Sequence, residues 1–195
     1  MPLLPMLVYG AEDREPALGY TLRIDGKEIR LEPGKEIQVD GEFKDPKVSL
    51  VPDKFRKFSA AGVSFNYPSH FGFAMDAEEE GVTIWTLDGT NVVIMLQAYD
   101  AVMNPKEFGE ILKSNYGPAT EVEAISHTFG GKKYSGVRVR AILAGASLTQ
   151  DLIALPSPEG SRILLLQGLD EKDEASKKDA KTVLKFLDET LKLEN

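Results

Sequence analysis

The chain has 195 residues, which suits one ordinary domain with a small additional unit, and its 31 acidic and 23 basic residues give a net charge of −8. This excess of acid opposes attraction to nucleic acid phosphates and anionic lipids, so we expect no nucleic acid partner. Apolar residues make up 42% of the chain and charged residues 28%, as in soluble globular proteins. No segment reaches the ~20 apolar residues of a membrane-spanning helix, so membrane insertion is not expected. The absence of cysteine excludes a disulfide framework.

Residues 1–17 begin with an apolar stretch from Leu3 to Tyr9, followed by two small residues and an acidic one. This order is similar to the end of a secretory signal peptide. The stretch is short, lies among prolines and lacks a positively charged leading segment, so an ordinary apolar arm and a truncated signal peptide are both open. The pattern favours an exported protein, periplasmic or extracytoplasmic, with a cytoplasmic protein as the alternative.

Residues 18–52 form a small β unit of strand-like pieces separated by turn dipeptides. The pieces are YTLRI, KEIRL, KEIQV and KVSLV. Asp25-Gly26 between two alternating pieces predicts a β-hairpin, because both central positions of a type I′ turn need positive φ. A unit this short buries little surface alone. We therefore expect it to pack against the main domain, residues 53–195.

The main domain begins with an alternating strand from Val63 to Pro68, and further strands are expected up to Tyr99. The run Val92 to Leu96 is apolar at five successive positions, and Ile84-Trp85 is apolar on both sides of its strand. Strands with two apolar faces are covered on both faces. This pattern predicts a sheet between two covering layers.

Two helices are expected to form those layers. Asn104 and Pro105 are a cap residue and a first helical residue, and Gly117-Pro118 ends the run, so a helix is predicted from Pro105 to Tyr116. Its spacing predicts docking through Phe108, Ile111 and Leu112. A second amphipathic helix is predicted from Ala175 to Leu193.

The basic residues Arg138 and Arg140 are candidate anion ligands. A two-residue hairpin turn at Gly130-Gly131 would place Glu123 opposite Arg138 and Glu121 opposite Arg140. Opposite charges across a strand pair stabilise by ~0.2 to 1 kcal/mol. A solvated charge ladder is therefore favoured over a ligand site, and both arginines remain weak candidates.

The same register places His127 opposite Tyr134, and these two are the other weak ligand-binding candidates. A histidine and tyrosine pair could transfer protons, but catalysis needs a nucleophile or an orienting carboxylate, which the sequence does not announce. His70 has no partner at metal-ligand spacing. The acidic stretches 76–80 and 170–174 do not follow a calcium-loop pattern. We therefore expect no catalytic residues, no metal and no cofactor.

Residues 58–193 resemble the PsbP-like superfamily. The resemblance is carried by the order of segments FSAAGVSFNYPSHF, NPKEFGEILKSNYG, TFGGKKYSGVRV and DLIALPSPEGSRILLLQG, followed by the closing helix. It implies an α+β fold, an α/β/α sandwich in which helices cover a central antiparallel sheet, here with the small β-hairpin unit at the amino end. It also implies an accessory or adaptor protein, because most members are not enzymes. No functional residue is carried over.

The function predicted from the sequence is that of a non-enzymatic accessory or binding protein, exported, which contacts an unknown protein partner or a small ligand. The alternative is a carrier of a small apolar ligand in a cavity between sheet and helices, suggested by the aromatic residues of the early strands. The least favoured hypothesis is a histidine-dependent hydrolase. It would need His127 or His70 in a pocket with a carboxylate and a nucleophile.

Overall fold

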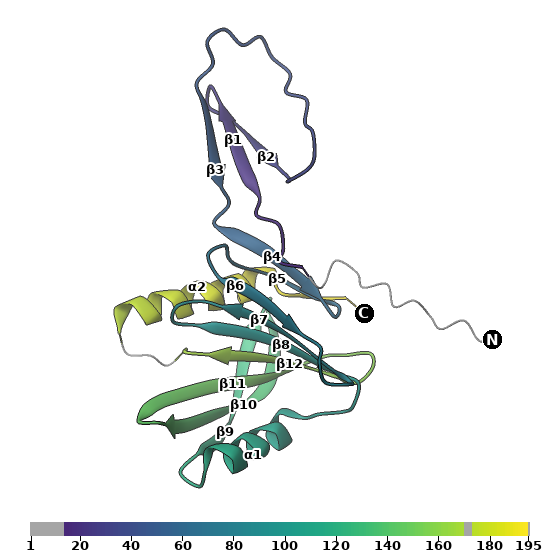
Figure 1. Cartoon of the computed structure of the whole chain (residues 1–195), viewed down its shortest axis with the longest axis vertical. Helices are drawn as coiled ribbons and strands as arrows, with labels where there is room; N and C mark the ends of the chain where they lie inside the picture. The colour runs from purple at the N-terminus through teal and green to yellow at the C-terminus, as the bar shows by residue number, and fades with distance from the viewer. Residues whose placement is uncertain (1–13, 170–172, 195) are drawn as a thin grey trace, which may run out of the picture.

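The computed structural model describes residues 14–169 and 173–194, and the apolar stretch of residues 3–9 lies outside this range. In the described part, three antiparallel sheets of three, seven and three strands are accompanied by two helices (Figure 1). Strand accounts for 48% of the structure and helix for 16%. The fold is therefore mainly β.

The N-terminal β unit is a three-stranded sheet in the order β2-β1-β3. Its strands are β1 (Tyr20–Ile24), β2 (Lys27–Leu31) and β3 (Val48–Pro52). The hairpin predicted at Asp25-Gly26 is confirmed, since both residues have positive φ, 48° and 85°, and Ile24 pairs with Lys27. The piece KEIQV is not a strand. It lies in the long connection 32–47 between β2 and β3.

A second small sheet has the order β13-β5-β4. It consists of β4 (Phe55–Ala60), β5 (Val63–Pro68) and the short β13 (Lys192–Leu193). The side chains of Phe58 and Phe65, paired across β4 and β5, are buried and stack with ring centroids 4.9 Å apart. This sheet thus carries large aromatic side chains into the core.

The seven-stranded sheet has the order β6-β7-β8-β12-β11-β10-β9. Its strands are β6 (Gly72–Asp76), β7 (Val82–Asp88), β8 (Val93–Tyr99), β9 (Glu121–Phe129), β10 (Lys132–Leu143), β11 (Ala146–Leu155) and β12 (Ser161–Gln167). The turn at Gly130-Gly131 is confirmed, with φ of 57° and 73°. The predicted register is also confirmed, because Glu123 pairs with Arg138 and His127 with Tyr134.

The helix α1 (Pro105–Tyr116) forms as predicted, and the Asn104 side chain accepts a hydrogen bond of 2.9 Å from the Glu107 N–H. It packs on β9 and β10 through Phe108 and Leu112. The predicted docking of Ile111 is wrong: its side chain is exposed. The buried residue of the helix is Gly109, which lies against valines of β9 and β10.

The helix α2 (Glu174–Thr190) begins after the cap residue Asp173, whose carboxylate accepts from the backbone N–H groups of Ala175 and Ser176. It packs on β5 and β9 through buried Val183 and Leu187. The sequence prediction extended this helix to Leu193. The chain instead leaves the helix after Thr190 and adds β13 to β5.

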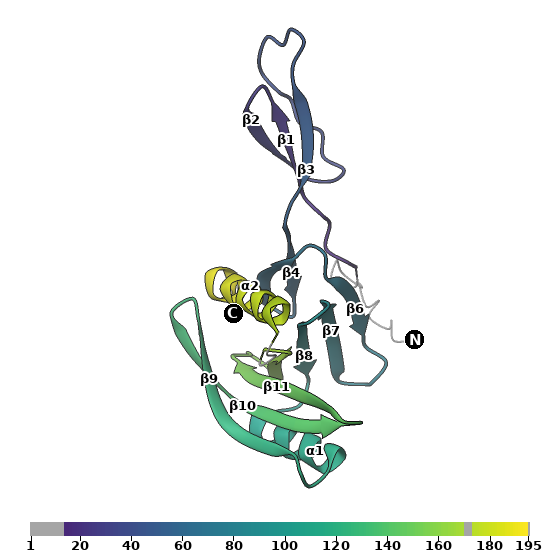
Figure 2. The same cartoon turned by 90° about the vertical axis from the view of Figure 1, so that its left-hand side faces the viewer.

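The predicted α/β/α sandwich is wrong. One face of the large sheet is covered by the β4–β5 sheet together with α2, and their contact forms the larger of the two core clusters. On the other face α1 covers only the β9–β11 side (Figures 1 and 2). A sheet supplies much of one layer and the second layer is incomplete, so the fold is mainly β.

The predicted packing of residues 18–52 on the main domain is also wrong. The N-terminal β unit projects from the body and meets it at its base (Figures 1 and 2). There the Asp53 N–H donates to the Gly19 carbonyl, and Arg56 of β4 forms an ion pair with Glu15. Every residue from 14 to 54 is half-buried or exposed.

Candidate functional site

Two of the residues predicted as weak ligand candidates, His127 and Arg138, meet at one buried carboxylate. Asp151 lies opposite Arg138 on β11, and its side chain is 0% exposed. The Arg138 guanidinium donates from Nε to Oδ1 at 2.5 Å and from Nη2 to Oδ2 at 2.8 Å. His127 Nε2 lies 2.8 Å from the same Oδ2. We call these three residues the Asp151 cluster.

The Asp151 cluster has the geometry of an internal ion pair. A planar guanidinium that donates two parallel hydrogen bonds to one carboxylate is a strong and directional arrangement. The His127 ring also stacks on Phe129, with centroids 5.6 Å apart. The cluster therefore supplies the carboxylate that a histidine-dependent hydrolase would need, but Arg138 already occupies both oxygens of that carboxylate.

Charge and burial act in opposite directions on Asp151. Burial alone would raise the pKa of its carboxyl, because it penalises the charged form. Hydrogen bonds and positive charge from Arg138 and His127 outweigh burial, and the pKa lies below its ordinary value. The carboxylate is therefore ionised at neutral pH and stabilises the folded protein.

This shift predicts a stability that depends on pH. A carboxyl whose pKa is lower in the folded than in the unfolded state stabilises the fold above its unfolded pKa of ~3.9. That stabilisation is lost as the pH falls through the lower, folded pKa. We expect urea midpoints of the wild type to fall between about pH 5 and pH 2 more steeply than those of Asp151→Asn. Parallel curves for the two proteins would contradict this assignment.

The other two weak candidates make different contacts from those of the Asp151 cluster. Arg140 donates from Nη1 to Glu123 Oε1 at 2.6 Å in an exposed ion pair. Glu123 lies diagonally across the strand pair from Arg140, whereas the predicted partner Glu121 lies directly opposite it. Tyr134 is buried in the core and packs on the Phe129 ring. Arg138 thus pairs with Asp151 on β11 in addition to lying opposite Glu123 in the predicted register.

Sequence reasoning missed Asp151. The available signal was the Ala144-Gly145 dipeptide between two strands, where Leu143 pairs with Ala146. A two-residue turn there sets a register that places Arg138 opposite Asp151. Asp151 directly precedes the apolar run of residues 152–155, so its neighbours in the sequence are typical of a buried strand and do not indicate a charged cluster.

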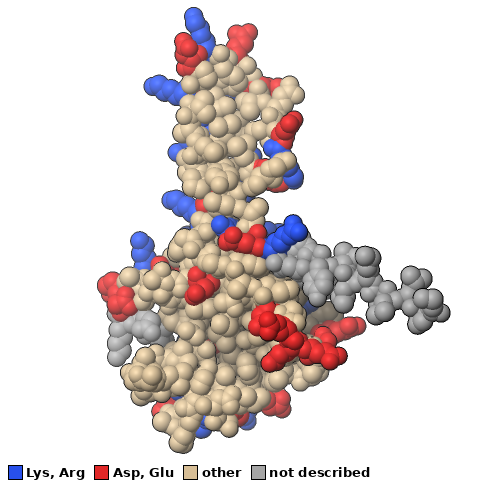
Figure 3. All heavy atoms as spheres, in the orientation of Figure 1, with Lys and Arg blue, Asp and Glu red and all other residues tan. Residues whose placement is uncertain are grey.

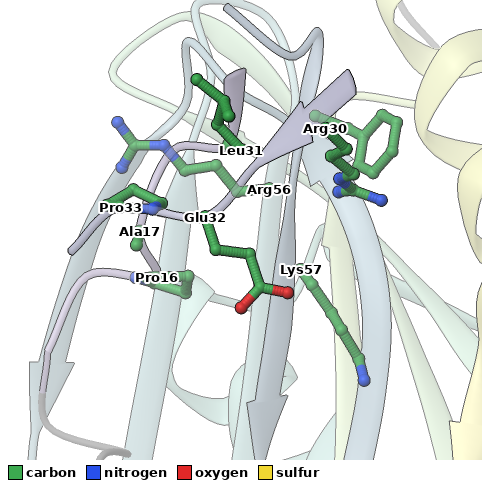
Figure 4. A pocket seen from close by; sticks show the side chains of 10 residues that line it. Pro16, Ala17, Arg30, Leu31, Glu32, Pro33, Arg56 and Lys57 are labelled. Carbon is green, nitrogen blue, oxygen red and sulfur yellow. The ribbon is translucent and has the colours of Figure 1, made fainter. Parts of the chain in front are cut away.

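A pocket of about 450 Å³ lies at the base of the N-terminal β unit. Arg30 from β2 and Arg56 and Lys57 from β4 surround it, with Glu32 between them (Figure 4). Arg30 is ion-paired with Asp53 at 3.1 Å and lies over the Phe55 ring. The charges of this pocket are thus largely compensated within the chain, and the pocket acts as the joint between unit and body.

Apolar side chains gather on one face of the N-terminal β unit. Strand register places alternate residues of its three strands on one face, and all of these are apolar except Lys27 at the start of β2. Val48 and Leu50 of the edge strand β3 are 58% and 56% exposed. We call this surface the open N-terminal face; it consists of Tyr20, Leu22, Ile24, Ile29, Leu31, Val48, Leu50 and Pro52.

Residues 14–169 and 173–194 contain no group of three or more histidine, aspartate or glutamate side chains placed to hold a metal ion. In the same part of the chain, neither helix is long and apolar enough to cross a membrane.

Comparison with known proteins gives little further information. No family model matches the chain, and no curated protein matches it. A solved structure from Bacteroides thetaiotaomicron VPI-5482 is similar, with 14% identity and a TM-score of 0.42. The match covers 73% of this chain and 50% of that chain, so the chain spans half the length of that structure. We draw no functional conclusion from a likeness of this size.

The resemblance to the PsbP-like superfamily is wrong. The mainly β architecture, with three antiparallel sheets and two helices among the described residues, differs from a helix-covered sandwich. The accessory role that the resemblance implied therefore loses that support.

Proposed function

We propose that this protein is a non-enzymatic binding protein that docks another protein on its open N-terminal face. The observation that carries the proposal is the exposure of Val48 and Leu50 on a unit that projects from the body. Apolar side chains gathered on one exposed face of a projecting unit are typical of interaction surfaces.

The N-terminal β unit lacks a layer to cover its apolar face. A three-stranded sheet needs a packed hydrophobic face for independent stability. The connection 32–47 does not bury that face, and it adds the exposed Ile37 and Phe43. A partner that covers the face would bury these side chains and stabilise the unit at the same time.

The edge strand β3 indicates how a protein would bind. β3 pairs with β1 on one side only, so its outer edge offers backbone N–H and C=O groups to an added strand. Strand addition uses these groups for affinity and alternate side chains for specificity. An extended segment of a partner protein could pair with the backbone of β3 and also contact Val48 and Leu50. A small ligand has no strand backbone with which to make the same hydrogen bonds.

This proposal retains the sequence-based prediction of a non-enzymatic accessory or binding protein. Among the described residues, the histidine with a carboxylate partner is His127, and Arg138 shares that carboxylate. A binding role needs no reactive group from this cluster. Export also stays a prediction.

Photo-crosslinking in cells of the native source tests the proposal. A benzoylphenylalanine replaces Leu50 in one full-length variant and Ser49 in a matched control, since both positions are exposed but lie on opposite faces of β3. We expect a discrete adduct with a different protein from position 50, none from position 49, and loss of the adduct on adding Val48→Asp.

Other outcomes would overturn the proposal. Equal adducts from both positions would mean that the face is not selective, and an adduct between two copies of this chain would replace the partner with self-association. No adduct from position 50 would also contradict it. Unchanged fluorescence of Trp85, the one tryptophan, confirms that each variant keeps a folded body.

A further inference from the structure

A second surface without a covering layer lies on the body, on strands β6 to β8. One face of these strands is buried in the core, through Trp85, Leu87, Ile94 and Leu96. The opposite face is half-buried except at Gln97, which is buried, and α1 borders it where Met95 packs on the helix cluster. We call it the open body face; it consists of Val82, Ile84, Thr86, Val93 and Met95.

The chain around the open body face carries charge of one sign. Between Lys57 and Lys106 there is no lysine or arginine, while six acidic residues occur there. They are Asp76, Glu78, Glu79, Glu80, Asp88 and Asp100. This segment alone accounts for a charge of −6 out of the net −8. Acidic side chains gather over this side of the body (Figure 3).

The acidic residues at the β6–β7 turn are placed at the rim of the face. The Asp76 carboxylate accepts from the Glu78 N–H at 2.9 Å, which fixes the turn. Asp100 lies beside Gly81, since its N–H donates to the Gly81 carbonyl. Burial raises the pKa of Tyr99, at the end of β8, and the negative charge of Glu79 raises it further.

Apolar and acidic groups also share one hollow on this face. A pocket of about 190 Å³ is lined by Val82 and Ile84 from β7, by Asp76 at the end of β6 and by Glu78 and Glu79 from the turn. An apolar floor with an acidic rim suits a side chain that combines an apolar stem with a positive end. Lysine and arginine have such side chains. Their charged ends would supply the positive charge that the chain between Lys57 and Lys106 lacks.

We propose that the open body face binds a basic polypeptide segment in which lysine or arginine residues alternate with apolar ones. Such a segment would place apolar side chains on Val82, Ile84 and Met95 and cations at the acidic rim. This surface is separate from the open N-terminal face, so the protein would hold two partners, or two parts of one partner, at different places.

Fluorescence anisotropy with a labelled peptide of alternating lysine and valine residues tests this inference. We expect binding that weakens as salt rises, because the rim charges are exposed. Glu79→Gln/Glu80→Gln should weaken binding at least about fivefold, and Ile84→Ser should weaken it by a similar factor. The control Glu107→Gln/Glu110→Gln removes the same charge from α1 and should change affinity less than about twofold.

Two further comparisons separate this inference from its rivals. A lysine–serine peptide of equal charge should bind clearly less well; equal binding would mean that the apolar floor is unused and would overturn the proposal. Equal losses from the β6–β7 and α1 variants would show general attraction to an acidic protein and would also overturn it. The Val48→Asp/Leu50→Asp variant should bind the peptide like the wild type, so failure here and failure of the N-terminal docking proposal are distinguishable.

Discussion

Replacing Arg138 with methionine is expected to lower the free energy of unfolding by about 3 to 5 kcal/mol, since it removes one partner of a buried ion pair. Asp151 is fully buried and receives two hydrogen bonds from Arg138. The variant therefore leaves a buried carboxylate that keeps its contact with His127 but has lost both hydrogen bonds from Arg138. Urea unfolding at neutral pH measures the loss.

Arg140→Met is the matched control for this prediction. Arg140 also forms an ion pair from β10, but with an exposed partner, Glu123, so its replacement should cost less than about 1 kcal/mol. The double variant Arg138→Met/Asp151→Leu should recover much of the loss, because it removes both charges and not only one. Equal losses from the two arginine variants would show that Asp151 does not depend on Arg138.

Replacing Phe65 with alanine is expected to cost about 3 to 5 kcal/mol, because it removes a large side chain from a packed core. Phe65 is 1% exposed and stacks on Phe58, and both lie in the core cluster between the two sheets. Phe43→Ala is the control. Phe43 is exposed in the connection 32–47, so its replacement should lower the free energy of unfolding by about 0.5 kcal/mol or less. A small loss for Phe65→Ala would mean that the β4–β5 sheet does not cover the large sheet.

Local features of the fold were predictable from the sequence because neighbouring residues determine them. Asp25-Gly26 and Gly130-Gly131 each set a two-residue turn, and the second fixed the whole β9–β10 register. Asn104 and Pro105 likewise fixed the start of α1. In each of these cases a few adjacent residues carry the conformational preference, so no information about distant packing was needed.

The covering layers could not be predicted in the same way. Ile84-Trp85 suggested a strand buried on both faces, but Trp85 is buried whereas Ile84 is half-buried. The alternation of burial along β7 and β8 depends on which distant elements pack on each face. Phe65 was predicted in the strand from Val63 to Pro68, but the sequence does not say that this strand and β4 lie against β7 and β8.

The candidate surfaces were the least predictable part. The Asp151 cluster depends on the β10–β11 register, which pairs Arg138 with Asp151. From the sequence, only the β9–β10 register of this sheet was predicted. The open N-terminal face was expected to be covered, because a short unit that leaves its apolar side uncovered is unfavourable alone. Alternation in β1 and β2 indicated half-exposed strands, but whether their apolar face meets the body or a partner depends on the direction in which the unit projects.

Thiol labelling of single-cysteine variants tests the openness of the N-terminal face most directly, because the chain has no cysteine of its own. Leu50→Cys should react with a maleimide within about threefold of the rate of Ser49→Cys, and at least about 100 times faster than Leu96→Cys in the core. If Leu50→Cys is instead as protected as Leu96→Cys, the face is already covered by the rest of the chain, and the proposed docking surface does not exist.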